Sequence, residues 1–560
     1  MEEEKSHLVK KGMMFLQQGP GEGWVSTMYY QRLPKGKPTG HNKNLELECS
    51  RFGEATNDSK ASVYACNSLI LSVEWLLFLV VFLSISISSS SAGRIGIPRG
   101  AAVLKKHHLP LKRAFSGDLH TYFYTQTLDH FNYKPESYAT FQQRYVINYK
   151  YWDGGAVSAP IFVCLGAEQA LETDLQTIGF LDDNAARFNA LIVYIEHRYY
   201  GKSVPFGSRE EAFRNAYRMG YLNSAQALAD YAEIIADIKN NLQASHSPVI
   251  VIGASYGGML ASWFRLKYPH LALGALASSA PVLYFDNITP SDAFYSIITK
   301  SFRETSESCY QTLRRSWSVI DSYASLPWGL SVLSSKFRTC YPLNSASELK
   351  KELESIYVVA SQFNQPAYLV NRVCAAIDET QTDDILFKIF AAVVAFNGNN
   401  RCYINPPNPE SQTVTGWKWQ TCSEMVMPIG VGENTMFQPN PFDLNTFIND
   451  CIRTYGVAPR PHWITSYYGG NDFNFILQKF GSNIIFSNGL RDPFSAGGVL
   501  EHISKSIRAV TTTYGSHCLD LFPKSDNDPE WLTKQRNIEL RIIKGWLVTY
   551  YADLKAFQKG

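Results

Sequence analysis

The chain has 560 residues, of which 45% are hydrophobic and 18% are charged, and its formal net charge is +2. This length can bury one large core and accommodate an inserted domain. The sequence has no long basic or acidic run, no phosphate-binding loop and no H-E-x-x-H metal motif. We therefore expect no nucleic-acid partner, no metal and no cofactor.

The first 120 residues predict targeting and connecting segments. Residues 1–67 are polar and irregular, and we expect a disordered extension. An apolar run at 75–87, followed by small residues, makes 68–93 either a signal peptide or an uncleaved signal anchor. Because signal peptides begin near residue 1, either the extension is spurious or the segment is an anchor. Residues 94–120 are predicted to be a linker or propeptide.

From about residue 121 the sequence is regularly patterned. Residues 141–149 alternate as a strand does, and the apolar runs 160–165 and 190–195 are typical of buried strands. Apolar residues recur at helical spacing between 222 and 240. Strands that alternate with helices predict a mostly parallel sheet.

A predicted strand, a sharp turn and a predicted helix follow one another at residues 249–268. The turn has the pattern G-x-S-x-G, formed by Gly253, Ser255 and Gly257. A nucleophile elbow requires this context, because its tight turn holds the serine hydroxyl clear of the backbone. Ser255 is therefore the candidate nucleophile. The alternative is a glycine-rich turn whose serine caps a helix.

A serine nucleophile needs an acid and a histidine, which follow it in that order in this kind of fold. Asp492 follows a predicted strand at 483–486, and His517 follows another at 507–514. Both would lie at the carboxyl ends of strands, where open α/β sheets bind ligands. Asp492 and His517 are therefore the candidate acid and base.

Two neighbouring residues are weaker candidates for these roles. We expect a helix between the two strands, and His502 should lie on its solvated face. Asp520 is a competing acid, but it lies too close to His517 along the chain to orient it from a separate strand end.

The oxyanion of the reaction needs two hydrogen-bond donors. The backbone N–H of Tyr256 follows from the elbow, and a second should come from the loop after 161–165, for which Ala167 is the candidate. Glu196, His197 and Arg198 follow a predicted strand. They could form a second acid–base group, but we favour a buried ion pair that braces the loop.

Four blocks of the sequence resemble signature blocks of one family: 196–203, 221–230, 253–258 and 487–493. It is the lysosomal Pro-X carboxypeptidase family of serine peptidases, which includes prolylcarboxypeptidase and dipeptidyl peptidase II. The similarity extends from about residue 122 to the C-terminus. It implies Ser255 as nucleophile, Asp492 as acid and His517 as base, which are the residues chosen above from chain order.

The predicted fold is an α/β-hydrolase with an inserted, mostly helical, disulfide-bonded cap domain. Residues 121–285 and 456–560 would form the two halves of the hydrolase, and 286–455 the cap over its active site. Six clustered cysteines without a C-x-x-C pattern predict three disulfides, with fifteen possible pairings. The resemblance implies the pairs Cys309–Cys374, Cys340–Cys402 and Cys422–Cys451.

The two cysteines that remain in this part of the chain are expected to be unpaired. Cys164 lies within a predicted core strand and should be a buried thiol. Cys518 is expected to pack beside His517 without a redox role. Asn287 begins a glycosylation pattern that the following Pro290 weakens.

The resemblance also implies an apolar pocket for a proline before the scissile bond. Met259, Met427 and Phe494 are the candidates, with ordinary core packing as the alternative. Phe494 departs from the Asp-Pro-Trp pattern of the family. The sequence at 167–169, Ala-Glu-Gln, departs from its Asn-Glu-Gly, so only a backbone donor is expected at Ala167.

The leading interpretation is a serine exopeptidase of the secretory pathway, located in a lysosome or vacuole or outside the cell. It would cleave after proline and release a single C-terminal residue. The alternatives are a dipeptidyl peptidase that releases N-terminal X-Pro pairs, an esterase on the same fold, and a non-catalytic binding protein. Peptides with proline near a terminus are the expected partners. A membrane is a partner only if the 69–92 segment is retained as an anchor, and a homodimer remains open.

Overall fold

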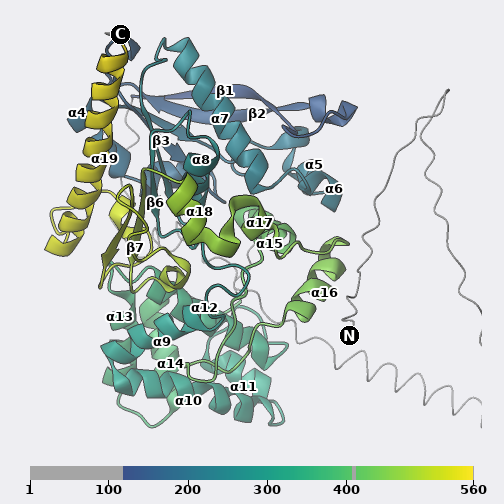
Figure 1. Ribbon diagram of the computed structural model, residues 1–560. Coiled ribbons are helices and arrows are strands. Elements are labelled where there is room, and N and C mark those ends of the chain that lie inside the picture. The colour runs from purple at the N-terminus through teal and green to yellow at the C-terminus, as the bar shows by residue number, and fades with distance from the viewer. Residues whose placement is uncertain (1–117, 406–410, 559–560) are drawn as a thin grey trace, which may run out of the picture. The chain divides into compact units, whose positions relative to one another are not determined.

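The computed structural model describes residues 118–405 and 411–558 (Figure 1). The predicted extension, the signal segment and nearly all of the linker lie outside the described residues. Strand β1 (Leu119–Thr127) already begins within the last residues of the predicted linker. None of the described helices is both long enough and apolar enough to cross a membrane.

An eight-stranded sheet has the order β1-β2-β4-β3-β5-β6-β7-β8. The pairs β1–β2 and β2–β4 are antiparallel, and all other pairs are parallel, as the sequence predicted. The remaining strands are β2 (Thr140–Asn148), β3 (Ile161–Leu165), β4 (Leu191–Ile195), β5 (Val249–Ala254), β6 (Gly274–Ser278), β7 (Ile484–Gly489) and β8 (Ile507–Thr512).

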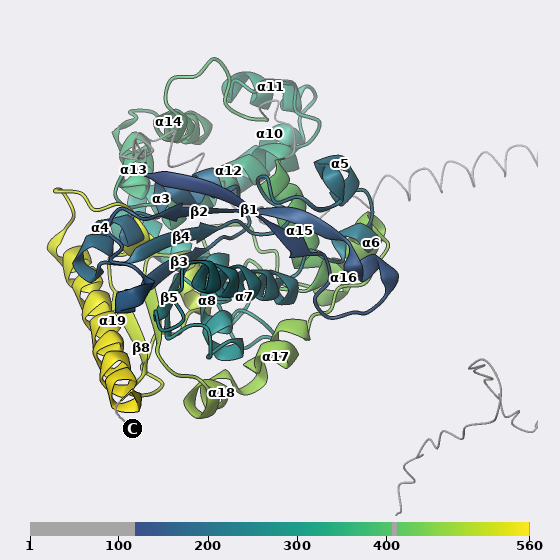
Figure 2. The same cartoon turned by 90° about the horizontal axis from the view of Figure 1, so that it is seen from above.

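The central strands are apolar on both faces, so helices cover both faces of the sheet. In β3, Val163 packs into the core on one face and Phe162 into the core on the other. The first face is covered by α7 (Ser224–Asn241) and α8 (Tyr256–Lys267). The second is covered by α3 (Leu171–Thr177), α4 (Phe180–Phe188) and α19 (Glu530–Phe557), as Figure 2 shows from above.

The predicted insertion is helical, and its first part has a hydrophobic core of its own. Six helices form this bundle, which extends beyond one end of the sheet in Figure 1. Disulfides Cys309–Cys374 and Cys340–Cys402 tie it together. The helices are α9 (Ala293–Thr305), α10 (Glu307–Ala324), α11 (Gly329–Lys336), α12 (Ala346–Gln362), α13 (Leu369–Glu379) and α14 (Ile385–Asn397).

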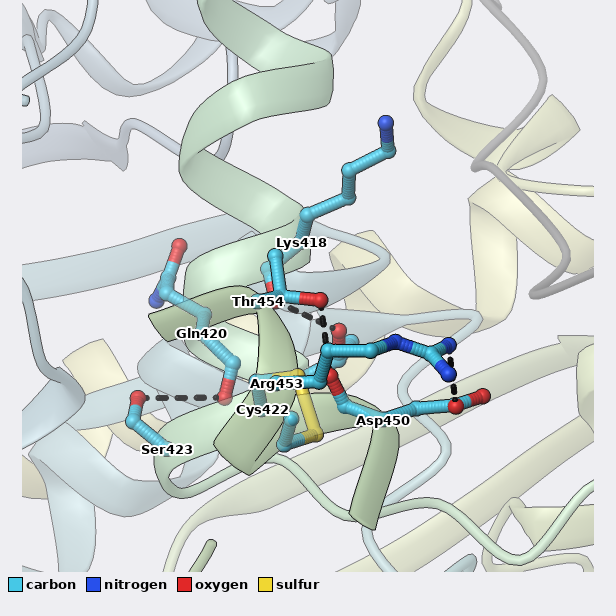
Figure 3. The surroundings of a disulfide bond; sticks show 9 residues. Lys418, Gln420, Cys422, Ser423, Asp450, Arg453 and Thr454 are labelled. Atoms are coloured by element: carbon cyan, nitrogen blue, oxygen red, sulfur yellow. Dashed lines mark hydrogen bonds and ion pairs between the residues drawn. A yellow bond between two sulfur atoms is a disulfide. The ribbon is translucent and has the colours of Figure 1, made fainter. Parts of the chain in front are cut away.

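The second part of the insertion packs against the hydrolase domain. Helices α15 (Gln412–Ser423) and α16 (Leu444–Tyr455) are joined by the disulfide Cys422–Cys451 (Figure 3). Trp417 of α15 lies in the same core as α7 and α8. All three disulfide pairs that the resemblance implied are therefore confirmed.

Short elements complete the described fold. After α16, helices α17 (Trp463–Tyr468) and α18 (Phe473–Phe480) return the chain to β7. The others are α5 (Arg209–Ala212), α6 (Ala216–Met219) and the 3-10 helices η1 (Pro135–Tyr138), η2 (Gly155–Val157), η3 (Pro205–Gly207), η4 (Gly470–Asp472), η5 (Pro493–Gly497) and η6 (Leu519–Leu521).

The prediction of a helix between β7 and β8 is wrong. The chain forms only η5 and then an irregular segment, because Gly497 and Gly498 are poor helix formers. A Cβ on Gly497 would lie 2.6 Å from the Tyr284 ring, which explains the glycine there. His502 is exposed, as predicted, but it lies in the irregular segment and accepts a hydrogen bond from the Ala509 N–H.

Candidate active site

Ser255 lies at the junction of β5 and α8 in a strained backbone conformation, with φ of 57° and ψ of −122°. A Cβ on Gly253 would stand 2.0 Å from the Gly257 carbonyl oxygen, so only glycine lets strand and helix approach this closely. In the described structure the Ser255 side chain makes no capping hydrogen bond to α8. The geometry thus favours the nucleophile elbow over a helix-capping serine.

Asp492 and His517 form a buried pair at the carboxyl ends of β7 and β8. Oδ2 of Asp492 lies 2.7 Å from Nδ1 of His517, and the two residues are 0% and 4% exposed. Oδ1 of the same carboxylate accepts a hydrogen bond from the Phe494 N–H. Burial alone would lower the pKa of His517, but Asp492 and Cys518 beside it raise the pKa well above its usual value. This pairing holds the ring with Nε2 as the nitrogen left for a nucleophile.

Asp520, the competing acid, belongs to a different buried cluster. Its Oδ1 accepts a hydrogen bond from the Ser278 hydroxyl at 2.6 Å. Glu539 lies nearby and accepts a hydrogen bond from Ser487. Burial raises the pKa of both carboxyls, and the charge of Asp520 raises that of Glu539 further. The geometry therefore makes Asp492, rather than Asp520, the partner of His517.

The loop after β3 lies against the first turn of α8. A Cβ on Gly257 would stand 3.5 Å from Cβ of Ala167. Tyr256 is the first residue of α8, where backbone N–H groups have no acceptor within the helix. The two predicted oxyanion donors, Tyr256 and Ala167, are thus on segments that meet beside Ser255.

Glu168, the next residue of this loop, was not predicted to have a role. Its side chain is buried, and among the described residues its Oε2 has no hydrogen-bond partner. Burial raises the pKa of the carboxyl to about 7, although its own backbone N–H and the nearby His517 imidazole act to lower it. Glu168 matches the middle residue of the family's Asn-Glu-Gly pattern, which is the one signal in the sequence that could have drawn attention to it.

The cap contacts the loop that carries His517. The backbone N–H of His517 donates to the Gln362 carbonyl, and the Gln365 N–H donates to the Ser516 hydroxyl. The Phe363 ring stands edge-on to the imidazole, with centroids 5.7 Å apart. These cap residues lie about 150 positions from His517 along the chain, so no local sequence pattern predicts the contact.

The three predicted pocket residues lie in different surroundings. The Phe494 ring lies 5.5 Å from the His517 ring and packs on the cap core. Met427 is half-buried between the hydrolase core and the cap core. Met259 is fully buried in the hydrolase core, one turn of α8 after Ser255. Phe494 and Met427 thus lie where the hydrolase domain meets the cap, whereas Met259 lies within the hydrolase core.

The residues after β4 form two buried ion pairs. Glu196 pairs with Arg144, and Arg198 pairs with Asp230, rather than Glu196 with Arg198. His197 hydrogen-bonds through Nε2 to the Tyr256 hydroxyl at 3.1 Å, and burial lowers its pKa to about 4. The geometry favours the bracing role expected for this loop.

Cys164 and Cys518 are buried free thiols. Asn287 is exposed, but Thr289 of its glycosylation pattern is buried and hydrogen-bonded to Leu283 O. In the described part of the chain, no group of three or more His, Cys, Asp or Glu side chains is arranged to hold a metal ion.

Comparisons with known proteins match most of the chain. The model of the family described as Serine carboxypeptidase S28 matches residues 126–539. Over 451 residues, the chain is 38% identical to the Lysosomal Pro-X carboxypeptidase of Pongo abelii and 37% identical to that of Homo sapiens. Each alignment covers 77% of this chain and 88% of the relative.

More distant relatives include the Prolyl carboxy peptidase like protein 5 of Caenorhabditis elegans. It is 32% identical over 448 residues, with 73% of this chain and 86% of the relative covered. An acetylester hydrolase structure from Corynebacterium glutamicum aligns at 12% identity and a TM-score of 0.37, covering 76% of this chain and 96% of that one. Since the family model spans the hydrolase domain and its cap, the chain belongs to the serine carboxypeptidase S28 family and is a serine peptidase with an α/β-hydrolase fold.

Proposed function

We propose that the protein is a Pro-X carboxypeptidase, an exopeptidase that removes the single residue after a proline at the C-terminus of a peptide. In this proposal Ser255 attacks the peptide carbonyl, and His517 takes its proton and later gives it to the leaving amine. Asp492 fixes the imidazole and stabilises its charged form. The backbone N–H groups of Tyr256 and Ala167 receive the oxyanion.

The observation that carries the proposal is the buried Asp492–His517 pair at 2.7 Å, after strands β7 and β8 of the same sheet whose strand β5 leads into the Ser255 elbow. The mammalian relatives named Lysosomal Pro-X carboxypeptidase support the specificity. A proline would lie between Phe494 and Met427. Three disulfides and the names of these relatives also support a lysosomal or secretory location.

The test compares three peptides that contain proline next to each end: one free at both ends, one amidated at the C-terminus and one acetylated at the N-terminus. We expect the free and acetylated peptides to lose one C-terminal residue, as read by mass spectrometry, and amidation to slow this strongly. Ser255→Ala should abolish cleavage. Release of an N-terminal pair, blocked only by acetylation, would instead identify a dipeptidyl peptidase.

A further inference from the structure

Glu168 is a buried acid that the proposed mechanism does not use. It is 7% exposed, and its Oε2 has no hydrogen-bond partner among the described residues. An unpartnered buried oxygen is costly to the fold, so it is rare unless a ligand satisfies it. A hydrogen-bonding group that arrives with a ligand would satisfy this atom.

The position of Glu168 indicates which part of a substrate it would meet. It follows Ala167, which lies against the Ser255 turn, and its carboxyl interacts electrostatically with the His517 ring. In serine peptidases the histidine delivers its proton to the leaving amine. A carboxyl that is near both the elbow loop and His517 would be close to the leaving residue, whose carboxylate is only two bonds from that amine in a carboxypeptidase.

We propose that Glu168 donates a hydrogen bond to the free C-terminal carboxylate of the peptide substrate. This role rests on the proposed carboxypeptidase function and makes Glu168 a specificity-determining residue of that reaction. It gives the enzyme a reason to prefer a free chain end over an internal peptide bond.

The surroundings of Glu168 favour the neutral form. Burial raises the pKa of the carboxyl to about 7, so it carries its proton at acidic pH. The ionisable groups that face it are His517, Tyr200 and Asp174, and His517 alone can be positively charged. Asp174 is itself held neutral, because burial raises its pKa to about 8. A buried acid kept neutral in this way can donate a hydrogen bond to an anion.

The experiment measures kcat/KM for two N-acetylated peptides that end in Pro-Phe, one with a free carboxylate and one amidated. Their ratio isolates recognition of the carboxylate, because both reactions use Ser255 and His517. For the wild-type enzyme we expect a ratio of about 10 to 100 at pH 5, as for a hydrogen bond to a charged group. The ratio should fall as the pH rises through about 7, where Glu168 loses its proton.

Two substitutions of Glu168 then distinguish the hydrogen bond that it donates from the effect of its charge. In Glu168→Gln the amide donates a hydrogen bond at every pH, so the ratio should persist above pH 7. In Glu168→Ala the ratio should approach one. Asp174→Asn is the matched control, since it removes another buried carboxyl with an unpartnered oxygen, and it should keep the wild-type ratio at pH 5.

Labelling of Ser255 by a phosphonate probe confirms that each variant is folded. If Glu168→Ala does not fold, the pH dependence of Glu168→Gln still decides the matter. A wild-type ratio in Glu168→Ala would overturn the role, and so would a Glu168→Gln enzyme that follows the wild-type fall above pH 7. If the wild-type enzyme cleaves neither peptide after proline, the carboxypeptidase function itself fails and the role with it.

Discussion

The hydrogen bond between Asp492 and His517 sets which ring nitrogen carries the proton. Because Nδ1 faces a carboxylate 2.7 Å away, it is the protonated nitrogen, and Nε2 is left to accept a proton from the nucleophile. Cys518 and Phe494 surround the pair, so water is excluded from it. The His517 ring can therefore act as a base only through Nε2.

Asp492→Asn should therefore inactivate the enzyme without unfolding it. The amide keeps the shape of the carboxylate, but it stabilises the wrong tautomer and cannot balance the charged imidazole. We expect kcat to fall about 10³- to 10⁴-fold with a nearly unchanged melting temperature. Steady-state kinetics and thermal melts check this. An active Asp492→Asn enzyme would mean that another acid orients His517. Asp520→Asn would then be the variant to compare.

Single residues of the site were predictable where a local pattern carries them. The strained Ser255 turn, Asp492 and His517 follow from the glycine spacing and from their places after strands. The burial of Glu168 near His517 and the hydrogen bond of Gln362 to His517 do not follow from such a pattern, because both depend on how distant parts of the chain pack. Burial of a charge, or its lack of a partner, is a property of packing that one sequence does not display.

At the scale of elements, the elbow strand, its helix and most parallel strands were predicted close to their observed bounds. The prediction of a helix carrying His502 was wrong, because Gly497 and Gly498 interrupt the segment. Helix α19 was not predicted, although its buried residues Leu540, Ile543 and Leu547 recur at helical spacing. The division of the insertion into a bundle and the α15–α16 pair depends on which core each helix joins, and helical periodicity does not specify that.

The disulfide Cys422–Cys451 joins two helices that have different tasks. Gln420 of α15 hydrogen-bonds the Tyr256 hydroxyl at 2.9 Å, next to the nucleophile. In helix α16, Cys451 is the one buried residue. Figure 3 shows the disulfide where the two helices cross, with Asp450 bound to Arg453 on α16. The bond therefore anchors α16 to the helix that supports the site.

Replacing both of these cysteines by alanine should destabilise the protein. The disulfide spans 29 positions, for which loop-closure entropy gives roughly 3 to 4 kcal/mol. We expect a lower melting temperature in calorimetry, with kcat/KM reduced much less at temperatures where the variant is folded. An unchanged melting temperature would mean that α16 contributes nothing to the cooperative unit.

At the scale of the whole molecule, several buried carboxyls make stability depend on pH. Burial raises the pKa of Glu168 and of Glu424 to about 7, and that of Asp174 to about 8. In the unfolded chain such groups titrate near pH 4. The folded protein thus holds more protons between pH 4 and 8, and it loses stability as the pH rises through that window.

We therefore expect a higher melting temperature at pH 5 than at pH 8. The direction follows because at pH 5 these carboxyls keep their protons in the folded chain, whereas in the unfolded chain most are ionised. Asp174→Asn should reduce the loss, because the amide never ionises. Glu172, whose pKa Arg144 lowers to about 2, acts only below this window. Equal melting temperatures at the two pH values would contradict the prediction.

The contact between the cap and the His517 loop limits how this enzyme admits a peptide. Gln362 and Gln365 hold the histidine loop by its backbone and by the Ser516 hydroxyl, and Phe363 packs on the ring itself. A cap that swung open as a hinged lid would carry the catalytic base away from Ser255 at every turnover. If the cap keeps these contacts during turnover, the chain end of a substrate enters without a lid opening, and peptide length and bulk should then govern the rate of entry.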